Sequence, residues 1–273
     1  MKILVLDGGG VFGDVQAAIL QGVDAFEKFD CFVGTSIGSA LCAAHAVGLR
    51  KDVGTPFFHH WMPRIFKVNI FRKYNPFNSR YSDKELNRAL RSVFRGMAFR
   101  DVKKPLFITS ANVSTRSLKV FNSIDDGSWL LWEAVRAAVA AETYFPSWKG
   151  LADGGVFANN PSMVAVAAAS RRLNVPIEEL EILSIGTGES SDNMGRPPVT
   201  MFGWGVWLVE ALLEGASDEM HDYFVRSLPV KKYERIQFAR RPGWKMDSPK
   251  AMFQAEDAWQ KDIMDAIQKV KDF

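Results

Sequence analysis

Along the first two thirds of the chain, short apolar runs alternate with segments whose apolar residues recur at helical spacing. The apolar runs predict buried strands at residues 2–6, 31–35, 106–113, 118–123 and 180–188. The helical spacing predicts helices at residues 14–29, 36–49, 128–141 and 160–173. Strands that alternate with helices favour an α/β fold, in which helices cover both faces of a mostly parallel sheet.

Two aromatic segments depart from this alternation. Residues 57–77 mix aromatic side chains with arginines and lysines, and residues 200–216 are strongly apolar. The second segment carries Phe202, Trp204, Trp207 and Leu208. Each segment is a candidate for a cap that contacts a membrane or for an acyl groove, although aromatic side chains at helical spacing are also typical of an ordinary core.

No linker composition separates the two ends of the chain, and only a soft boundary is drawn near residue 195. We therefore expect one domain, residues 1–273. Its core, about residues 1–190, carries the motifs described below, and a helical C-terminal portion, about residues 200–273, packs on that core.

The composition is that of an ordinary globular protein, with 47% hydrophobic and 24% charged residues. A net charge of +3 is too small to favour nucleic acid as a partner, and it would not repel an anionic membrane. Cys31 and Cys42 form neither a disulfide framework nor a metal-binding motif, so we expect no metal. Without a visible secretory signal or spanning window, we expect a cytoplasmic protein that can contact a membrane peripherally.

The segment GTSIG, residues 34–38, is a GxSxG motif between a predicted strand and a predicted helix. A sharp turn at this place lifts the serine hydroxyl out of the backbone. Gly34 and Gly38 leave room for the tight crossing of strand and helix. The N-terminus of the helix stabilises negative charge that develops at Ser36. This context favours Ser36 as a nucleophile, whereas the pentapeptide alone also occurs in structural turns.

A nucleophilic serine needs a base, and the chain has four histidines: His45, His59, His60 and His221. His45 follows Ser36 on the same helix and points away from it, and His59 and His60 are expected to pack or to lie at the surface. His221 would complete the chain order of an α/β-hydrolase triad. A hydrolase serine normally follows several strands, however, and Ser36 follows only the second, which disfavours a histidine triad.

The segment ADGGVFANNP, residues 152–161, supplies an acid instead. Asp153 could cap the helix that begins near Pro161 through an Asx-type turn. It could also take the proton from Ser36 directly, without a histidine. An aspartate at its ordinary pKa of about 3.9 is a poor base for a hydroxyl, so this second interpretation predicts a partly buried pair.

The segment LDGGGVFG, residues 6–13, satisfies GxGxxG and leaves two interpretations open. A dinucleotide-binding loop requires an acid about 20 residues on, at the end of a strand. Asp30 lies at about that distance but precedes the next apolar run, and Asp7 stands directly before the first glycine. The alternative is an oxyanion hole, in which backbone N–H groups receive the negative oxygen of a reacting ester.

Taken together, DGGGVFG at 7–13, GTSIG at 34–38 and DGGVFANNP at 153–161 resemble the motifs of the patatin-like phospholipase family in order and approximate spacing. AAVAAETYFPSW at 137–148 and LSIGTG at 183–188 extend the similarity, which covers about residues 1–190. The resemblance implies a three-layer α/β/α sandwich. It also implies a hydrolase without a cofactor, whose substrate is a phospholipid or another acyl-ester lipid.

The resemblance further implies a role for individual residues. Ser36 would be the nucleophile and Asp153 the base of a Ser–Asp dyad that works through an acyl-enzyme. The expected oxyanion hole consists of the N–H groups of Gly8, Gly9, Gly10 and Ile37. The remaining motif glycines are Gly13, Gly34, Gly38, Gly154 and Gly155. Asp7 is expected to hold the glycine loop by accepting backbone hydrogen bonds.

One position departs from the family pattern. The family usually carries Arg or Lys before the last glycine of the first motif, and Phe12 stands there in this chain. The missing cation weakens the case for direct recognition of a lipid phosphate and would also suit a less polar acyl substrate. Two rival functions remain: a catalytically silent module that binds lipid or protein, and the disfavoured dinucleotide-dependent oxidoreductase.

Overall fold

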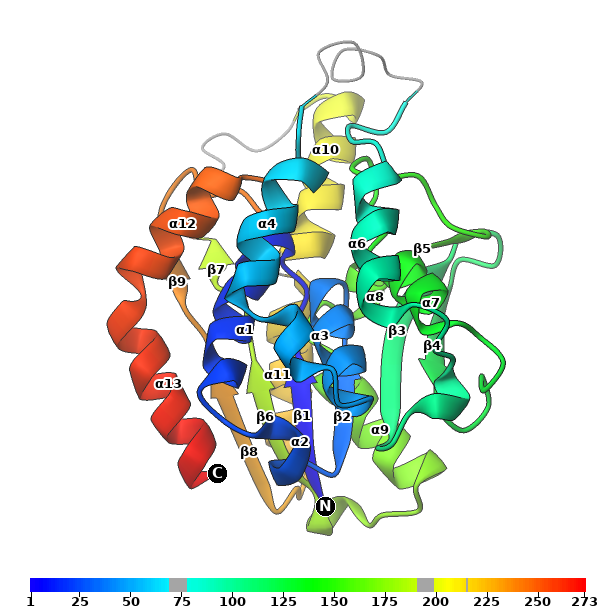
Figure 1. Ribbon diagram of the computed structural model, residues 1–273, viewed down its shortest axis with the longest axis vertical. Coiled ribbons are helices and arrows are strands. Elements are labelled where there is room, and N and C mark those ends of the chain that lie inside the picture. The colour runs from blue at the N-terminus through cyan, green and yellow to red at the C-terminus, as the bar shows by residue number, and fades with distance from the viewer. Residues whose placement is uncertain (69–77, 191–198, 215) are drawn as a thin grey trace.

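The computed structural model describes residues 1–68, 78–190, 199–214 and 216–273, and its centre is a seven-stranded sheet (Figure 1). The strand order is β4-β3-β2-β1-β6-β8, and β5 pairs with β3. The strands are β1 (Lys2–Leu6), β2 (Cys31–Gly34), β3 (Leu106–Asn112), β4 (Ser117–Asn122), β5 (Leu151–Asp153), β6 (Glu181–Ile185) and β8 (Lys232–Ile236). Strands β3, β2, β1, β6 and β8 run parallel, whereas β4 and β5 pair antiparallel with β3.

Helices cover both faces of this sheet, which confirms the three-layer sandwich. Along β1, Leu4 and Leu6 belong to one apolar core, and Ile3 and Val5 belong to the other. Because successive side chains of a strand point to opposite faces, a central strand buried on both sides reads as one continuous apolar run.

The larger core lies against eight helices of the described segments, which cover one face. They are α1 (Gly13–Gln21), α2 (Ala25–Lys28), α3 (Ile37–Ala46), α4 (Thr55–Ile65), α6 (Lys84–Phe94), α7 (Leu131–Ala138), α12 (Pro249–Ala258) and α13 (Gln260–Asp272). The second core lies against α9 (Ser162–Arg172) and α11 (Ala216–Ser227). The remaining helices and strands are α8 (Gly155–Ala158), α10 (Met201–Glu214), and the short pair β7 (Glu189–Ser190) and β9 (Ala239–Arg240). Among the described residues, no helix combines the length and hydropathy needed to cross a bilayer.

Two expectations about the elements need correction. The helix predicted over residues 14–29 is broken near Gly22, because the Asp24 carboxylate accepts a hydrogen bond from the Glu27 N–H and starts the separate helix α2. The C-terminal portion is helical but also contains β8, which pairs in parallel with β6 and extends the central sheet. The pattern KYERI of β8 is too polar to be recognised as a strand that belongs to a parallel sheet.

Strand β8 brings a partner to Asp7 at the end of β1. The buried Asp7 carboxylate accepts two hydrogen bonds from the Arg235 guanidinium, at 3.0 Å from Nη1 and 2.6 Å from Nη2. Arg235 Nη1 also donates to Ser184 Oγ at 2.7 Å. Asp7 was expected to accept backbone hydrogen bonds, and that detail was wrong. The carboxylate is held by a bidentate ion pair that joins the first and the last strand of the parallel set.

Replacing Arg235 by methionine leaves the Asp7 carboxylate buried without its cation. We expect Arg235→Met to lower the free energy of unfolding by about 3–5 kcal/mol, measured by urea denaturation at pH 8. Arg172→Met, which removes only the exposed ion pair of Arg172 with Asp125, is the control and should cost less than about 1 kcal/mol. Equal losses in the two variants would contradict a structural role for the buried pair.

Candidate active site

Ser36 stands on a sharp turn between β2 and α3. Its φ of 50° and ψ of −126° lie in a region that non-glycine residues seldom adopt. A Cβ atom on Gly34 would lie 2.5 Å from the Gly38 carbonyl oxygen, and one on Gly38 would collide with the Leu6 carbonyl oxygen. The two motif glycines therefore permit a backbone crossing that no larger residue would allow, and this crossing presents the serine hydroxyl at the carboxyl edge of the sheet.

Asp153 reaches the same place through the pairing of β3. Strand β4 occupies one edge of β3, so β2 and β5 share the other, with Gly34 beside Ile108 and Asp153 beside Ser110. The end of β5 thus lies next to the turn that follows β2. A Cβ atom on Gly154 would collide with the Thr109 hydroxyl, so the chain can leave β5 here only with glycine.

The two predicted residues are in direct contact. Ser36 Oγ donates a hydrogen bond of 2.6 Å to Asp153 Oδ2, and the Gly155 N–H donates one of 2.8 Å to Asp153 Oδ1. The Asp153 side chain is buried, as the sequence predicts for a carboxylate that must act as a base. Burial raises the pKa of Asp153 to about 7, although the hydrogen bonds from Ser36 and Gly155 act in the opposite direction.

A second acid, which the sequence analysis did not single out, lies near this pair. Burial and the nearby charge of Asp153 raise the pKa of Glu142 to about 8. Its Oε2 atom is buried and has no hydrogen-bond partner among the described residues. Glu142 falls inside the segment 137–148, whose similarity to the family was noticed, but nothing in its spacing indicated that it would approach Asp153.

The glycine loop follows β1 and faces Ser36. Gly9 and Gly10 have φ of 152° and 59°, and both line the same cavity as Ser36 and Ile37. Within the described chain, no hydrogen bond is recorded from the N–H groups of Gly9, Gly10 or Ile37. Gly8 differs, because its N–H donates to the Asn159 carbonyl oxygen at 3.1 Å. That N–H holds the loop in this structure, which sets Gly8 apart from the other three N–H groups predicted for the oxyanion hole.

Two contacts fix the loop from the C-terminal half. Thr187 Oγ1 donates a hydrogen bond of 2.5 Å to the Gly8 carbonyl oxygen. The Val11 N–H donates one of 2.9 Å to the Met246 carbonyl oxygen. A Cβ atom on Gly9 would collide with the Thr187 side chain, and one on Gly10 with the Met246 carbonyl. Both partners are distant from the loop in sequence, so no local pattern indicates them.

An apolar cavity with a volume of about 70 Å³ opens from the Ser36–Asp153 pair. Most of its wall is aliphatic or aromatic. Besides the polar end, the lining consists of Ala40, Phe57, Met62, Ile65, Phe66, Leu86, Ala89, Leu90, Val139, Ala141, Tyr144, Phe145 and Met246. The described part of the aromatic segment 57–77 is thus a wall of this cavity, whereas residues 69–77 lie outside the described residues.

The histidines do not join the pair. His45 is buried against the Phe32 ring, and burial lowers its pKa to about 4. His221 Nδ1 lies 2.5 Å from the Asn160 carbonyl oxygen, and His221 is not among the described residues that line the cavity. Asp30, the acid considered for a ribose, accepts a hydrogen bond from the Lys2 N–H at the start of β1, at the edge of the sheet opposite to the glycine loop.

Phe12, the position that departs from the family pattern, is buried. The Arg240 guanidinium lies 4.5 Å from the centre of the Phe12 ring, and Arg240 Nε donates a hydrogen bond of 3.4 Å to the Thr187 carbonyl oxygen. A cation therefore does approach the loop, but it comes from β9 and stacks on an aromatic ring. No feature of the sequence pointed to Arg240.

Comparisons with known proteins show which family and which solved structures this chain resembles. The family model described as patatin-like phospholipase matches residues 4–166. The chain is 30% identical over 227 residues to a cGAMP-activated phospholipase of Vibrio cholerae, covering 68% of this chain and 64% of that protein. It is 22% identical over 276 residues to a cUMP-AMP-activated phospholipase of Escherichia coli, covering 87% of this chain and 83% of that protein. The crystal structure of VipD from Legionella pneumophila has a similar fold, with a TM-score of 0.53, 13% identity, and coverage of 98% of this chain and 67% of that one.

The raised pKa of Asp153 makes a prediction about stability. The pKa is about 7 in the folded state against an ordinary 3.8, so the buried carboxylate costs stability as the pH rises from about 4 through 7. We expect the stability of Asp153→Asn relative to wild type to be about 2–3 kcal/mol greater at pH 8 than at pH 5, because wild type loses about 1.4 kcal/mol for each pH unit between pH 5 and the folded pKa of about 7. Thermal unfolding at the two pH values measures this difference.

Asp52→Asn, at an exposed carboxylate, reports any general effect of removing one negative charge. If, after this correction, the stability difference between Asp153→Asn and wild type were the same at pH 5 and pH 8, the raised pKa of Asp153 would be refuted.

Proposed function

The chain belongs to the patatin-like phospholipase family, and from this premise we propose that it is a lipid acyl hydrolase in which Ser36 is the nucleophile and Asp153 is its base. The observation that carries the proposal is the hydrogen bond of 2.6 Å from Ser36 Oγ to a buried Asp153 carboxylate. A nucleophile in contact with a base whose pKa is near neutrality is the arrangement that general-base activation requires.

The proposed reaction has two steps. Asp153 Oδ2 accepts the Ser36 proton while Ser36 Oγ attacks the ester carbonyl, and the proton then passes to the alcohol that leaves. The acyl group remains on Ser36 as an ester. In the second step Asp153 takes a proton from water, the hydroxide attacks the acyl-enzyme, and the proton returns to Ser36 as the fatty acid leaves. No histidine takes part in this scheme.

Backbone N–H groups would stabilise the negative oxygen of each tetrahedral intermediate. Gly9, Gly10 and Ile37 are the candidates, since Gly8 already donates to Asn159. Ile37 also contributes the positive end of the α3 dipole. A well-placed donor of this kind contributes about 2.7–4 kcal/mol to the transition state. Glycine is needed at two of these positions because a side chain on Gly9 would collide with Thr187 and one on Gly10 would collide with Met246.

The cavity supports a lipid as substrate. Its wall is almost entirely apolar, and the reacting pair lies at its polar end. A fatty acyl chain would bury its methylene groups there at about 0.8 kcal/mol each while its carbonyl reaches Ser36. Both the glycerophospholipids and simpler acyl esters have this chemistry. We favour a phospholipid because the relatives named above are described as phospholipases.

Contact with a membrane is proposed through α10, the apolar helix of the segment 200–216. The side chains of Met201, Trp204 and Leu208 expose 92%, 50% and 52% of their surface. Tryptophan beside aliphatic residues is typical of a helix that lies in the interface of a bilayer. A peripheral position at a membrane is the corresponding proposal for its location.

Labelling with a fluorophosphonate tests the nucleophile. Wild-type protein should be labelled and should release fatty acid from phospholipid or p-nitrophenyl esters. Ser36→Ala should lose the label and at least about 10³-fold in kcat/KM. Ser92→Ala, which removes a hydroxyl bonded within α6, should behave as wild type. An unlabelled wild type would support the silent binding module, and a labelled Ser36→Ala would place the nucleophile elsewhere.

Vesicle flotation tests the membrane face. Trp204→Glu should reduce the fraction of protein that floats with anionic phospholipid vesicles by about tenfold, since burying one such side chain contributes about 1.5–3 kcal/mol. Hydrolysis of a soluble short-chain ester should stay unchanged. Met264→Glu, at an exposed apolar residue of α13, is the matched control. If both variants float like wild type, α10 is not the membrane face. Phe71, an aromatic residue of the segment 57–77, falls outside the described residues, so no variant is placed there.

A further inference from the structure

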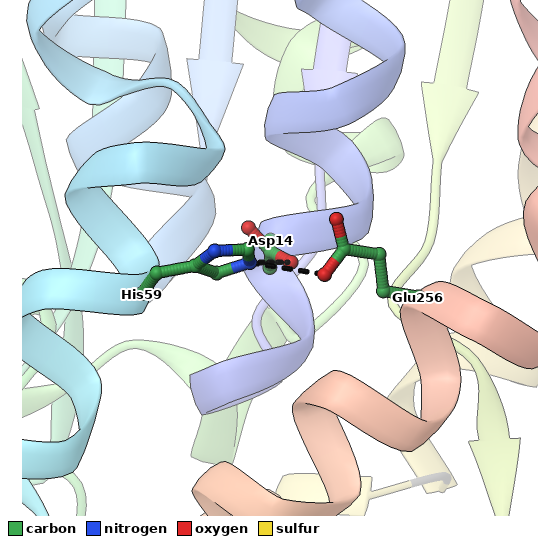
Figure 2. Close-up of side chains that lie close together, drawn as sticks. All are labelled: Asp14, His59 and Glu256. Atoms are coloured by element: carbon green, nitrogen blue, oxygen red, sulfur yellow. Dashed lines mark hydrogen bonds and ion pairs between the residues drawn. The ribbon is translucent and has the colours of Figure 1, made fainter.

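A cluster of three metal-ligating side chains lies outside the proposed active site. Asp14 comes from α1, His59 from α4 and Glu256 from α12, and Figure 2 shows the three side chains converging between their helices. His59 Nε2 lies 3.0 Å from Glu256 Oε2 and 3.7 Å from Asp14 Oδ2. One potential ligand atom from each residue lies within 4.8 Å of the other two.

The Asp14 carboxylate is the unusual member of this cluster. Its side chain is 1% exposed, and within the described chain neither of its oxygen atoms has a hydrogen-bond partner. A buried carboxylate without a donor is costly, and a native structure normally compensates it with a proton, a cation or a metal. Asp7 is compensated by the Arg235 guanidinium. Among the described residues, no arginine or lysine forms an ion pair with Asp14.

We propose that Asp14, His59 and Glu256 bind one divalent transition-metal ion, with zinc as the best match. Zinc takes imidazole nitrogen and carboxylate oxygen at about 2.0–2.2 Å, which places tetrahedral ligand atoms about 3.3 Å apart. The two separations of His59 Nε2 fall on either side of that value. The imidazole ligand argues against magnesium and calcium, which prefer sites made of oxygen alone.

The exposure of the cluster suits an ion that enters from solvent. The side chains of His59 and Glu256 are 37% and 36% exposed, whereas Asp14 closes the inner side. Three protein ligands leave a fourth position for water. The Phe253 ring packs against the His59 ring, with centroids 4.9 Å apart, and restricts the imidazole orientation. The site therefore has a fixed inner carboxylate and two outer ligands that can close on the ion.

The three helices give the ion a structural role. Helix α1 begins at Gly13, directly after the glycine loop, and α4 forms a wall of the apolar cavity. Helix α12 follows Met246, whose carbonyl oxygen holds the Val11 N–H. A bound ion would thus tie the loop and the cavity wall to the C-terminal portion. Neither Ser36 nor Asp153 is a ligand, so the ion takes no part in the proposed reaction.

Metal binding to the 273-residue chain tests the proposal. The protein is stripped with a chelator, dialysed, and titrated with Zn²⁺ in competition with a chromogenic indicator; metal content is measured after gel filtration. We expect one Zn²⁺ per chain. At about a hundred times Kd, the ion should raise the thermal midpoint by roughly 5 °C or more. Co²⁺ should give the visible absorption of a four-coordinate ion with nitrogen and oxygen ligands.

Variants at the two outer ligands localise the site. His59→Gln and Glu256→Gln change partly exposed side chains and should fold; each should weaken Zn²⁺ binding more than about tenfold, since even groups outside the ligand set cost that much. His60→Gln, which changes the adjacent histidine of α4, should bind as wild type and controls for adventitious histidine binding. The same variants keep the fluorophosphonate label, so failure of the metal site leaves the proposed hydrolase independently testable.

The proposal is overturned if the stripped wild type binds no Zn²⁺ and shows no change in thermal midpoint, which would mean that Asp14 is compensated by a proton alone. It is equally overturned if His59→Gln and Glu256→Gln bind Zn²⁺ as tightly as wild type.

Discussion

The site depends on one close approach of backbone, that of Gly38 at the start of α3 to the Leu6 carbonyl at the end of β1. Strands β1 and β2 lie side by side in register, so this approach brings the glycine loop after Leu6 against the turn after Gly34. Any side chain at Gly34 or Gly38 would push the helix away from the sheet. The contact between Ser36 and Asp153 depends on the tightness of this crossing.

Three of the buried carboxylates, those of Asp7, Asp153 and Asp14, are each compensated differently. Asp7 forms a bidentate ion pair with Arg235, which fixes the end of β1. Asp153 accepts hydrogen bonds from Ser36 and Gly155 and keeps a raised pKa, which suits a group that must bind and release a proton. Among the described residues, Asp14 has neither a guanidinium partner nor a hydrogen-bond donor, and for that reason we infer an ion beside it. Burial is common to all three, and the neighbouring side chains decide the chemistry.

Local sequence determined most of the elements and identified Ser36 and Asp153 as a candidate pair. Continuous apolar runs predicted the central strands because a strand covered on both faces has no polar side. Glycines at fixed offsets marked Ser36 and the loop before it, since only glycine tolerates those backbone approaches. Asp153 was found from a second Asp-Gly-Gly run and the resemblance to a family. These signals are carried by neighbouring residues, so they can be read without knowing the fold.

Contacts between distant segments were decided by tertiary structure alone. Nothing in KYERI showed that Arg235 would meet Asp7, because the strand that carries it joins the sheet far from β1 in sequence. The hydrogen bond from the Gly8 N–H to the Asn159 carbonyl oxygen depends on how α8 packs against β3. The sequence pattern alone could not distinguish Gly8 from the other glycines of the loop. Asp14, His59 and Glu256 lie on three helices whose faces meet only in the folded chain. Residue spacing can indicate a site that lies within one helix, strand or turn. A site formed by several helices or strands depends on how those elements pack, and only the folded core determines that packing.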